Sequence, residues 1–380
     1  MRLKSLSFED KRTGWKLDDL HLDRFNLLVG ASGVGKTRIL MAIRTIYMLG
    51  RNGDTTDADQ GVRFDLCFEH EGQHYRWQFD SADRDLPPEE EGGAPAKNSN
   101  VVVLSEHLHS SGEGQLVERD PHRFLFGSRE LPALNRTESA LQLLDEPSIV
   151  RLRQAFATCF LRVMDAQSTA SIVVNARGML RRFPTLESLR GLVGLQPVVK
   201  AFVLQNGFVE QFERFKQLFI DIFPSVEDVI VNQRESYTQR GGPRDRLSFK
   251  LKERGVPTWI ESQDISSGMA RTLNHLVDLM LAPAGTVVLI DEFENSLGVN
   301  CMGPLTDFVL SRAKDLQFII TSHHPYIINN IPKTHWKLVR RKGSTVRVTP
   351  ASEIAALQGT SAQDDFIRLI NSPEFEEGME

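Results

Sequence analysis

Residues 26–40 read Asn-Leu-Leu-Val-Gly-Ala-Ser-Gly-Val-Gly-Lys-Thr-Arg-Ile-Leu, and the rest of the chain is best understood from this stretch. Its middle fills the pattern G-x-x-x-x-G-K-[ST], in which glycine-rich backbone turns its N–H groups toward phosphate oxygens. A mostly apolar run at 25–29 precedes the pattern, and apolar residues recur at helical spacing over 37–49. We therefore expect a buried strand, a phosphate-binding loop and a helix in succession, with Gly50 ending the helix.

The residues of this loop are the candidate nucleotide-binding residues, namely Gly30, Ala31, Ser32, Gly33, Val34, Gly35, Lys36, Thr37 and Arg38. Lys36 would reach the β- and γ-phosphates, and the Thr37 hydroxyl would bind Mg²⁺. The positive end of the following helix would face the anion. A glycine-rich turn can also simply join a strand to a helix, but the flanking strand and helix favour the phosphate-binding interpretation.

A second cluster of polar residues follows a buried strand far along the chain. The run 286–290 is almost entirely apolar, as is typical of a parallel strand buried on both faces, and Asp291 and Glu292 follow it directly. Ligands of open α/β sheets bind at the carboxyl ends of the strands. We therefore expect Asp291 to contact the Mg²⁺ and Glu292 to polarise an attacking water. The apolar run 317–321 also ends in polar residues, where His323 would sense a γ-phosphate.

Composition indicates an ordinary globular protein. The chain has 380 residues, is 41% hydrophobic and carries a formal net charge of −5, so it can bury a large core and has no overall positive field that would attract nucleic acid or an anionic membrane. The three cysteines are widely spaced, so we expect them to be reduced thiols that pack in the interior; they are Cys67, Cys159 and Cys301. The sequence shows no signal-peptide core and no membrane-spanning stretch, and we expect a soluble, cytoplasmic protein without a membrane partner.

The first part of the chain is rich in strands. Residues 1–9 and 15–22 alternate roughly in polarity and predict a hairpin that leads into the strand before the phosphate-binding loop. Residues 62–69 and 73–80 predict two further strands of a β subdomain. The stretch 81–99 is acidic and rich in turn-forming residues, and we expect a flexible surface insertion there.

The later part of the chain begins with helices and returns to strands. Apolar stripes predict helices from about 138 to 223, including the whole run 150–163, and strands are expected over 226–236 and 247–254. A helical tail is expected over 352–370. We divide the chain into an N-terminal lobe, a helical insertion, a C-terminal lobe and a tail, with the boundaries 1–137, 138–225, 226–348 and 349–380.

The order of these motifs resembles that of ABC-class ATPases. In this order, residues 30–37 resemble the Walker A motif of these ATPases and Ile265–Met269 resemble the signature. Residues 286–292 resemble the Walker B motif, Glu294–Leu297 the D-loop, and Thr321–His323 the segment with the switch histidine. More narrowly, the chain resembles the RecF/SMC/OLD-like group of AAA-type core ATPases, whose members work on DNA or in anti-phage defence. Thr37 and Asp291 lie 254 residues apart, which leaves room for the subdomains that this group inserts. The resemblance implies an α/β fold, a P-loop NTPase of the ABC ATPase-head type with an antiparallel β subdomain and an inserted helical lobe.

The resemblance also implies a mechanism with ATP and Mg²⁺. The signature residues of one copy would bind the nucleotide of a second copy; they are Ser266, Ser267 and Gly268. ATP would then hold copies together in a head-to-tail dimer or a higher homo-oligomer, and hydrolysis would release them. The implied catalytic residues are Glu292, His323 and Lys36, and the implied metal ligands are Thr37 and Asp291.

The sequence departs from the family pattern at three places. Met269 replaces the glutamine of the signature, and Gly298 stands where an acidic residue or histidine follows the D-loop. Both changes bear on the rate of hydrolysis. The glutamine of the Q-loop has no clear counterpart, and Gln60, Gln115 and Glu106 are all candidates.

Two functions are compatible with this reading of the motifs. The first is an ATP-hydrolysing switch that controls a separate effector such as a nuclease, resembling the ATPase subunits of the PARIS and Septu anti-phage systems. Only about fifty residues follow Pro332, too few for the nuclease domain that OLD-type relatives carry. The alternative is a RecF-like factor that binds nucleic acid through basic residues such as Arg240, Arg244, Arg246, Lys250, Lys252 and Arg254. A transporter subunit or a P-loop kinase would explain fewer of the motifs.

Overall fold

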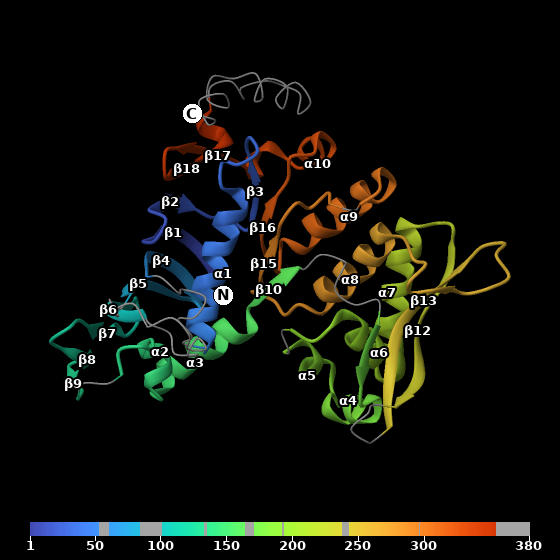
Figure 1. Cartoon of the computed structure of the whole chain (residues 1–380), viewed down its shortest axis with the longest axis horizontal. Coiled ribbons are helices and arrows are strands. Elements are labelled where there is room, and N and C mark those ends of the chain that lie inside the picture. Colours follow the sequence, from blue (N-terminus) through green and yellow to red (C-terminus); the bar gives the residue numbers. More distant parts are fainter. Residues whose placement is uncertain are drawn as a thin grey trace, which may run out of the picture. The chain divides into compact units, whose positions relative to one another are not determined.

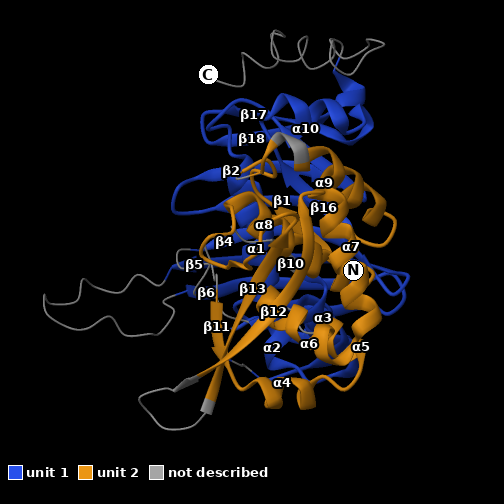
Figure 2. Cartoon of the chain, turned by 90° about the vertical axis from the view of Figure 1, so that its right-hand side faces the viewer, with its two compact units in different colours: residues 1–160, 317–380 blue, residues 161–316 orange. Residues whose placement is uncertain are grey.

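The computed structural model describes residues 1–52, 61–83, 101–132, 135–163, 171–191, 194–237, 243–295 and 297–354. The chain divides into two compact units, of which unit 1 holds residues 1–160 and 317–380 and unit 2 holds residues 161–316 (Figure 2). Most of the acidic insertion expected at 81–99, and the tail expected over 352–370 from residue 355 onward, lie outside the described residues. Residues 81–83 belong to a strand.

Parallel strands form the centre of unit 1. β3 (Phe25–Val29) lies between β16 (Gln317–Thr321) and β17 (Trp336–Lys342) and runs parallel to both (Figure 1). Every residue of β3 and β16 is buried, which explains why both strands are mostly apolar. β18 (Thr345–Pro350) lies between β17 and β2 (Trp15–His21); it pairs antiparallel with β17 and parallel with β2.

An antiparallel β subdomain extends this sheet and confirms the predicted hairpin at the N-terminus. β2 pairs with β1 (Arg2–Asp10), and burial alternates along the next strands because one face packs on the core while the other meets solvent. The strands follow one another in the order β1, β4 (Val62–His70), β5 (Gln73–Asp83), β6 (Val101–Ser110), β7 (Gly114–Arg119), β8 (Phe124–Phe126) and β9 (Arg129–Glu130).

Helix α1 (Lys36–Asn52) does not end at Gly50, so that prediction is wrong. Glycine weakens a helix interior, but here it is required by packing. A Cβ added to Gly50 would lie 2.6 Å from Cγ of Phe156, which belongs to α3 (Pro147–Thr158). The glycine therefore allows α3 to approach the backbone of α1, and the helix continues past it. Short helix α2 (Ala140–Leu143) also packs against these two helices.

The helix predicted over the whole run 150–163 is also only partly correct. α3 ends at Thr158, where the N–H of Cys159 donates to the carbonyl of Ala155, and β10 (Phe160–Val163) follows. The ring of Phe160 stacks on Tyr47 of α1 with centroids 4.3 Å apart. Burial against α1 fixes this residue, although its apolar character continues the helical pattern of α3.

Unit 2 combines a small antiparallel sheet with helices. β13 (Pro243–Glu253) pairs with β11 (Ser171–Val174), β12 (Val226–Tyr237) and β14 (Ile260–Glu261), which confirms the strands expected over 226–236 and 247–254. β11 lies in the range predicted as helical; its pairing with β13 overrides that pattern. The helices are α4 (Ala176–Arg182), α5 (Leu186–Arg190), α6 (Pro197–Gly207), α7 (Val209–Ile222), α8 (Ser267–Leu281) and α9 (Val299–Arg312).

The remaining elements complete the two units. β15 (Val287–Ile290) belongs to unit 2, and unit 1 also contains α10 (Pro325–Asn330) and the 3₁₀ turns Lys333–His335 and Ala351–Glu353. All three cysteines are free thiols, as expected. Among the residues that the structure describes, we find no helix with the length and apolar character needed to cross a membrane.

Candidate functional site

Three glycines shape the predicted phosphate-binding loop between β3 and α1. Gly30, Gly33 and Gly35 have φ angles of +152°, +83° and +104°. A Cβ added at Gly30 would lie 2.5 Å from the carbonyl oxygen of Val339 on β17, and one at Gly35 would lie 3.2 Å from Cγ2 of Val346 on β18. The loop therefore rests directly on these two strands, which requires residues without a side chain.

Lys36 lies at the start of α1 with its side chain folded over the loop. Its Nζ donates to the carbonyl oxygens of Gly30 and Ala31 at 2.8 and 2.9 Å. An ammonium group has three donors, so it can exchange such carbonyl contacts for phosphate oxygens. α1 has 17 residues and no acidic residue in its first turn, so no carboxylate there opposes an anion at the positive end of the helix. Thr37 is the next residue of this turn.

β16 brings His323 to the same edge of the sheet as the loop. Thr321 pairs with Leu28 in parallel register, so the chain leaves β16 at the edge where it leaves β3. The N–H of Ser322 donates to the carbonyl of Leu28 at 3.5 Å, and the Oγ of Ser322 accepts from the N–H of His324 at 3.1 Å. The side chain of His323 is exposed. Unit 1 therefore brings two of the predicted elements, the loop and the switch histidine, to one edge.

Arg38 joins the start of α1 to the turn between β1 and β2. Its Nη2 donates to Oγ1 of Thr13 at 2.8 Å and to Oδ2 of Asp10 at 3.2 Å. The guanidinium lies 5.0 Å from the ring centroid of Trp15, which is a cation–π contact. Because Trp15 is only 1% exposed, its ring is a packing group beneath the loop.

In unit 2, β15 ends at the two predicted carboxylates. All four residues of the strand are buried, whereas Asp291 is half-buried and Glu292 is exposed. Glu292 has a φ of +46°, a left-handed conformation that is uncommon for a residue with a side chain. This conformation costs roughly 1–2 kcal/mol, so it persists only where surrounding contacts support it.

Arg271 of α8 supplies one such contact, although it belongs to none of the sequence motifs. Its side chain is 1% exposed, and its Nη2 donates to the carbonyl oxygens of Glu292 at 3.1 Å and Asp291 at 3.4 Å. Its position in the sequence could have identified it, because a basic residue in the buried stripe of an amphipathic helix needs a polar partner.

The predicted signature residues form the beginning of α8. Ser266 is the N-cap of this 15-residue helix, and its Oγ accepts from the N–H of Met269 at 3.3 Å. Ser266 and Ser267 are exposed, and Gly268 is half-buried. N–H groups in the first turn of a helix have no intrahelical acceptor, so a helix start that solvent can reach is able to receive an anion.

Glu106, a candidate for the Q-loop position, is instead part of the core of unit 1. It is 1% exposed, and its carboxylate accepts from Nε1 of Trp77 at 3.0 Å, Oγ of Ser139 at 2.6 Å and the N–H of Ala140 at 2.7 Å. Burial raises the pKa of this carboxyl, and the hydrogen bonds partly oppose that rise. The side chain thus joins β5 and β6 to the first turn of α2.

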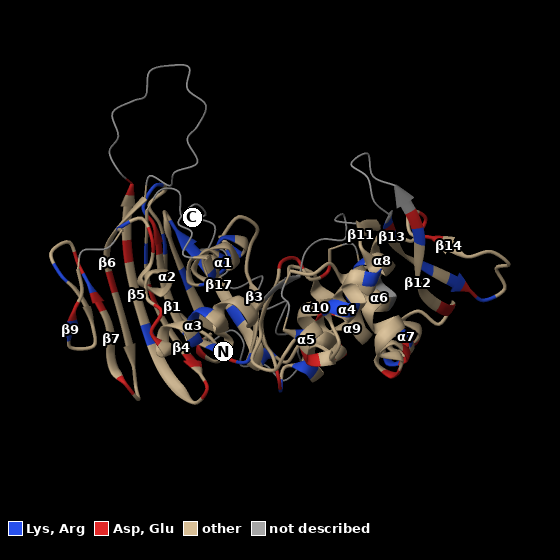
Figure 3. Ribbon diagram, turned by 90° about the horizontal axis from the view of Figure 1, so that it is seen from below, with Lys and Arg blue, Asp and Glu red and all other residues tan. Residues whose placement is uncertain are grey.

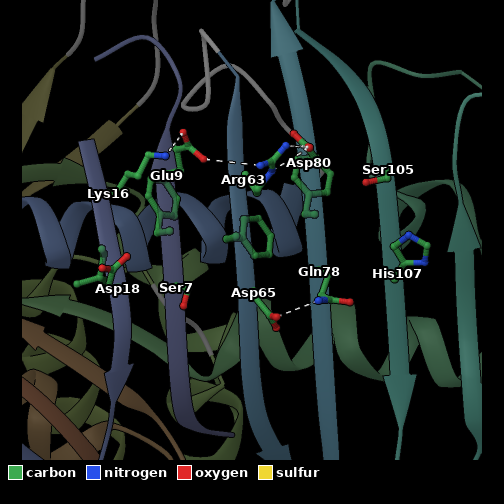
Figure 4. Close-up of a pocket in the computed structure, with 14 residues that line it drawn as sticks. Ser7, Glu9, Lys16, Asp18, Arg63, Asp65, Gln78, Asp80, Ser105 and His107 are labelled. Atoms are coloured by element: carbon green, nitrogen blue, oxygen red, sulfur yellow. Dashed lines mark hydrogen bonds and ion pairs between the residues drawn. The ribbon is translucent and has the colours of Figure 1, made fainter. Parts of the chain in front are cut away.

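A polar groove of about 420 Å³ crosses the β subdomain (Figure 4). Its charged side chains pair with one another: Arg63 lies 2.7 Å from Asp80 and 3.9 Å from Glu9, and Glu9 also pairs with Lys16 at 3.2 Å. None of the predicted site residues lines it. The groove is therefore separate from the phosphate-binding loop.

The predicted site residues fall into two groups. The loop and His323 belong to unit 1, and the signature and strand-end carboxylates belong to unit 2. In the described parts of both units, no three His, Cys, Asp or Glu side chains are grouped so that they could hold a metal ion. Thr37 and Asp291 offer one hydroxyl and one carboxylate. Each is an oxygen donor of the kind that Mg²⁺ accepts beside waters and phosphate oxygens, one in unit 1 and one in unit 2.

Comparison with known families matches an AAA domain to a part of the chain that holds the second group and His323. Residues 171–329 match the family model described as "AAA domain, putative AbiEii toxin, Type IV TA system". The match spans α8 with its signature, the carboxylates after β15 and His323. No curated protein matches the chain.

Similar solved structures include head domains of SMC proteins. One is the SmcHead bound to the C-winged helix domain of ScpA, whose sequence is 13% identical to this chain. The alignment has a TM-score of 0.48 and covers 92% of this chain and 97% of that chain. The SMC head domain from Thermotoga maritima is 12% identical, with a TM-score of 0.46 and coverage of 92% and 99%. The predicted α/β class is confirmed by the parallel strands and the antiparallel subdomain of unit 1, and the family match over 171–329 supports an AAA-type ATPase domain.

Proposed function

We propose that the chain binds ATP with Mg²⁺ and hydrolyses it as an ABC-type switch. The observation that carries this proposal is the loop of unit 1, where the ammonium of Lys36 lies over Gly30 and Ala31 at the start of a long helix. Backbone N–H groups of the loop and this ammonium match the charge and shape of phosphate groups. His323, at the same edge of the sheet, would sense the γ-phosphate.

The strand-end carboxylates have separate tasks in this proposal. The bound Mg²⁺ would neutralise phosphate charge, with Thr37 and Asp291 as its protein ligands. Glu292 is exposed and would orient and polarise the attacking water. Ser266, Ser267 and Gly268 would hold the γ-phosphate of a nucleotide bound to a second copy, because they begin a helix that solvent can reach.

Association is the proposed output of the switch. ATP would hold copies head to tail, and hydrolysis would remove the γ-phosphate that both copies contact. We infer that this change controls a separate effector protein, such as a nuclease, in bacterial anti-phage defence. The description of the matched family as a putative toxin of a toxin–antitoxin system supports a role of this kind.

Light scattering of wild type, Glu292→Gln and Lys36→Ala with ATP and Mg²⁺ tests the switch. Glu292→Gln should accumulate as a larger ATP-dependent assembly and lose hydrolysis, because it binds ATP but cannot polarise the water. Lys36→Ala should stay at the mass measured without nucleotide. Equal masses and equal hydrolysis rates for all three proteins would show that these residues do not have the proposed roles.

A second candidate function, nucleic-acid binding, is favoured by a surface of unit 2. One side of the β12–β13 strand pair carries five basic residues, which we call the basic strand face: Arg234, Arg244, Arg246, Lys250 and Lys252. Figure 3 shows basic segments along these strands. Arg234 lies directly opposite Arg246 in the strand register, and like charges in this position destabilise a sheet unless an anion offsets them.

The balance of charge on the basic strand face is positive. Glu261 pairs with both Arg234 and Lys250 at 2.8 Å, whereas Arg244 and Arg246 are exposed. If duplex DNA binds there, the double substitution Arg244→Gln with Arg246→Gln should weaken binding and lower the slope of log K against log[salt] by about 2. Fluorescence anisotropy over a salt series measures both. An unchanged slope would exclude this face as the contact.

A further inference from the structure

Three polar residues of α8 lie on one buried face of the helix. Arg271, His275 and Asp278 follow one another at spacings of four and three residues, which places them on the same side. Asp278 accepts from Nζ of Lys200 on α6 at 2.7 Å, and the two side chains are 12% and 6% exposed. At the other end of this face Arg271 contacts the turn after β15. α8 thus connects the signature residues at its start with the turn that carries Glu292.

The contact of Arg271 depends on the conformation of that turn. In an extended strand, successive carbonyl groups point to opposite sides. Here the carbonyls of Asp291 and Glu292 both accept from one nitrogen, Nη2 of Arg271, and the left-handed φ of Glu292 bends the chain at this point. A buried guanidinium needs acceptors, and a left-handed residue needs support. The two requirements satisfy each other.

The charge that faces these carbonyls comes from Arg271 and not from its neighbour on the helix. Burial and the nearby charge of Arg271 lower the pKa of His275 to about 3, so the imidazole is neutral near pH 7. His275 is 0% exposed, and neither ring nitrogen has a hydrogen-bond partner among the described residues.

We propose that Arg271 is a positioning residue that couples the signature end of α8 to the carboxylate of Glu292. This inference rests on the proposed ATPase function and deepens it. Arg271 lies five residues after Ser266, about 7.5 Å along a rigid helix. When the helix start takes up the phosphate of a second copy, any displacement of α8 is transmitted to the two carbonyls. Hydrolysis of the chain's own ATP therefore depends on whether its signature is occupied.

Kinetics of Arg271→Met and Arg271→Lys test the coupling. Methionine keeps much of the length and apolar volume but has no donor, so kcat should fall at least 10-fold while ATP affinity changes less than two-fold. Lysine can donate to a carbonyl and should restore part of kcat. The double variant Lys200→Met with Asp278→Leu is the matched control, because it removes a buried charge pair from the other end of the same helix face. It should keep kcat within about two-fold if only the contact at the turn matters.

Hydrogen exchange provides a readout that does not depend on activity. In Arg271→Met the amides of 291–295 should exchange at least several-fold faster than in wild type, whereas in the control double variant they should not. If Arg271→Met does not fold, the exchange rates of these amides in Arg271→Lys are compared with those in wild type instead. Equal exchange of this segment in the folded Arg271 variants and in wild type overturns the proposal.

Combination with Glu292→Gln separates this inference from the function on which it rests. If Arg271 acts through Glu292, the further loss of kcat caused by Arg271→Met should largely disappear in the Glu292→Gln background. Full additivity of the two losses overturns the positioning role alone. If Glu292→Gln itself leaves hydrolysis unchanged, the proposed function fails instead.

Discussion

The carbonyl oxygen of Val339 lies only 2.5 Å from the point where a Cβ of residue 30 would be, so Gly30 and β17 are in direct backbone contact. Gly30→Ala should therefore displace the phosphate-binding loop and abolish the stabilisation of the protein by ATP. Gly33→Ala is the matched comparison, because it imposes backbone strain at a φ of +83° without any atom within 4 Å. It should retain some ATP stabilisation. Thermal unfolding with and without ATP measures both, and equal behaviour would contradict the role of this contact.

Glu106→Gln should lower stability without lowering ATP affinity. The carboxylate accepts three hydrogen bonds from Trp77, Ser139 and Ala140, and an amide cannot accept all of them because its nitrogen is a donor. One buried donor left without a partner costs about 1–3 kcal/mol of unfolding free energy. Urea unfolding and equilibrium ATP binding check the two parts. If Glu106→Gln lost much of its ATP affinity but unfolded at the same urea concentration as wild type, Glu106 would have the role of the Q-loop residue.

Alanine should have opposite effects at two glycines that both lie in helices. At Gly50 the new Cβ would lie 2.6–2.9 Å from the ring of Phe156, and such overpacking costs about 1–3 kcal/mol. At Gly207 in α6 nothing lies within 4 Å, so the higher helix propensity of alanine should stabilise by up to about 1 kcal/mol. Denaturant unfolding of the two variants compares them directly. Stabilisation by Gly50→Ala would show that α3 can move away at little cost.

His275 should make the protein less stable in mild acid. Its pKa is about 3 in the folded protein and near 6.5 when unfolded, so between these values the unfolded state binds the extra proton. The free energy of unfolding therefore falls as pH decreases below about 6.5, by roughly 1.4 kcal/mol between pH 7.5 and 5.5. His275→Leu removes this contribution, whereas Asp278 and the other acidic groups remain in both proteins. Unfolding curves at the two pH values should show a smaller loss in the variant, and equal losses would contradict the buried, neutral imidazole.

Local features of the sequence were sufficient for much of the fold. The strands β3, β15 and β16 are mostly apolar because every residue in them is buried, and the hairpin of β1 and β2 follows from alternating polarity. Such patterns depend on residues close together in the chain. The same patterns failed where a distant neighbour decided the outcome, as at β11, whose residues become a strand by pairing with β13.

By itself, the sequence determined the chemistry of the candidate site: a glycine-rich loop with Lys36, two carboxylates after a buried strand, and a polar end to β16. Each is a short motif whose residue types are dictated by phosphate, metal or water. Tertiary structure decided the rest. Gly50 stays within α1 because Phe156 packs on it, Glu106 is held in the core by Trp77, Ser139 and Ala140, and Arg271 reaches the carbonyls beside Glu292. These contacts join residues about 20 to 100 positions apart, and only packing brings such residues together.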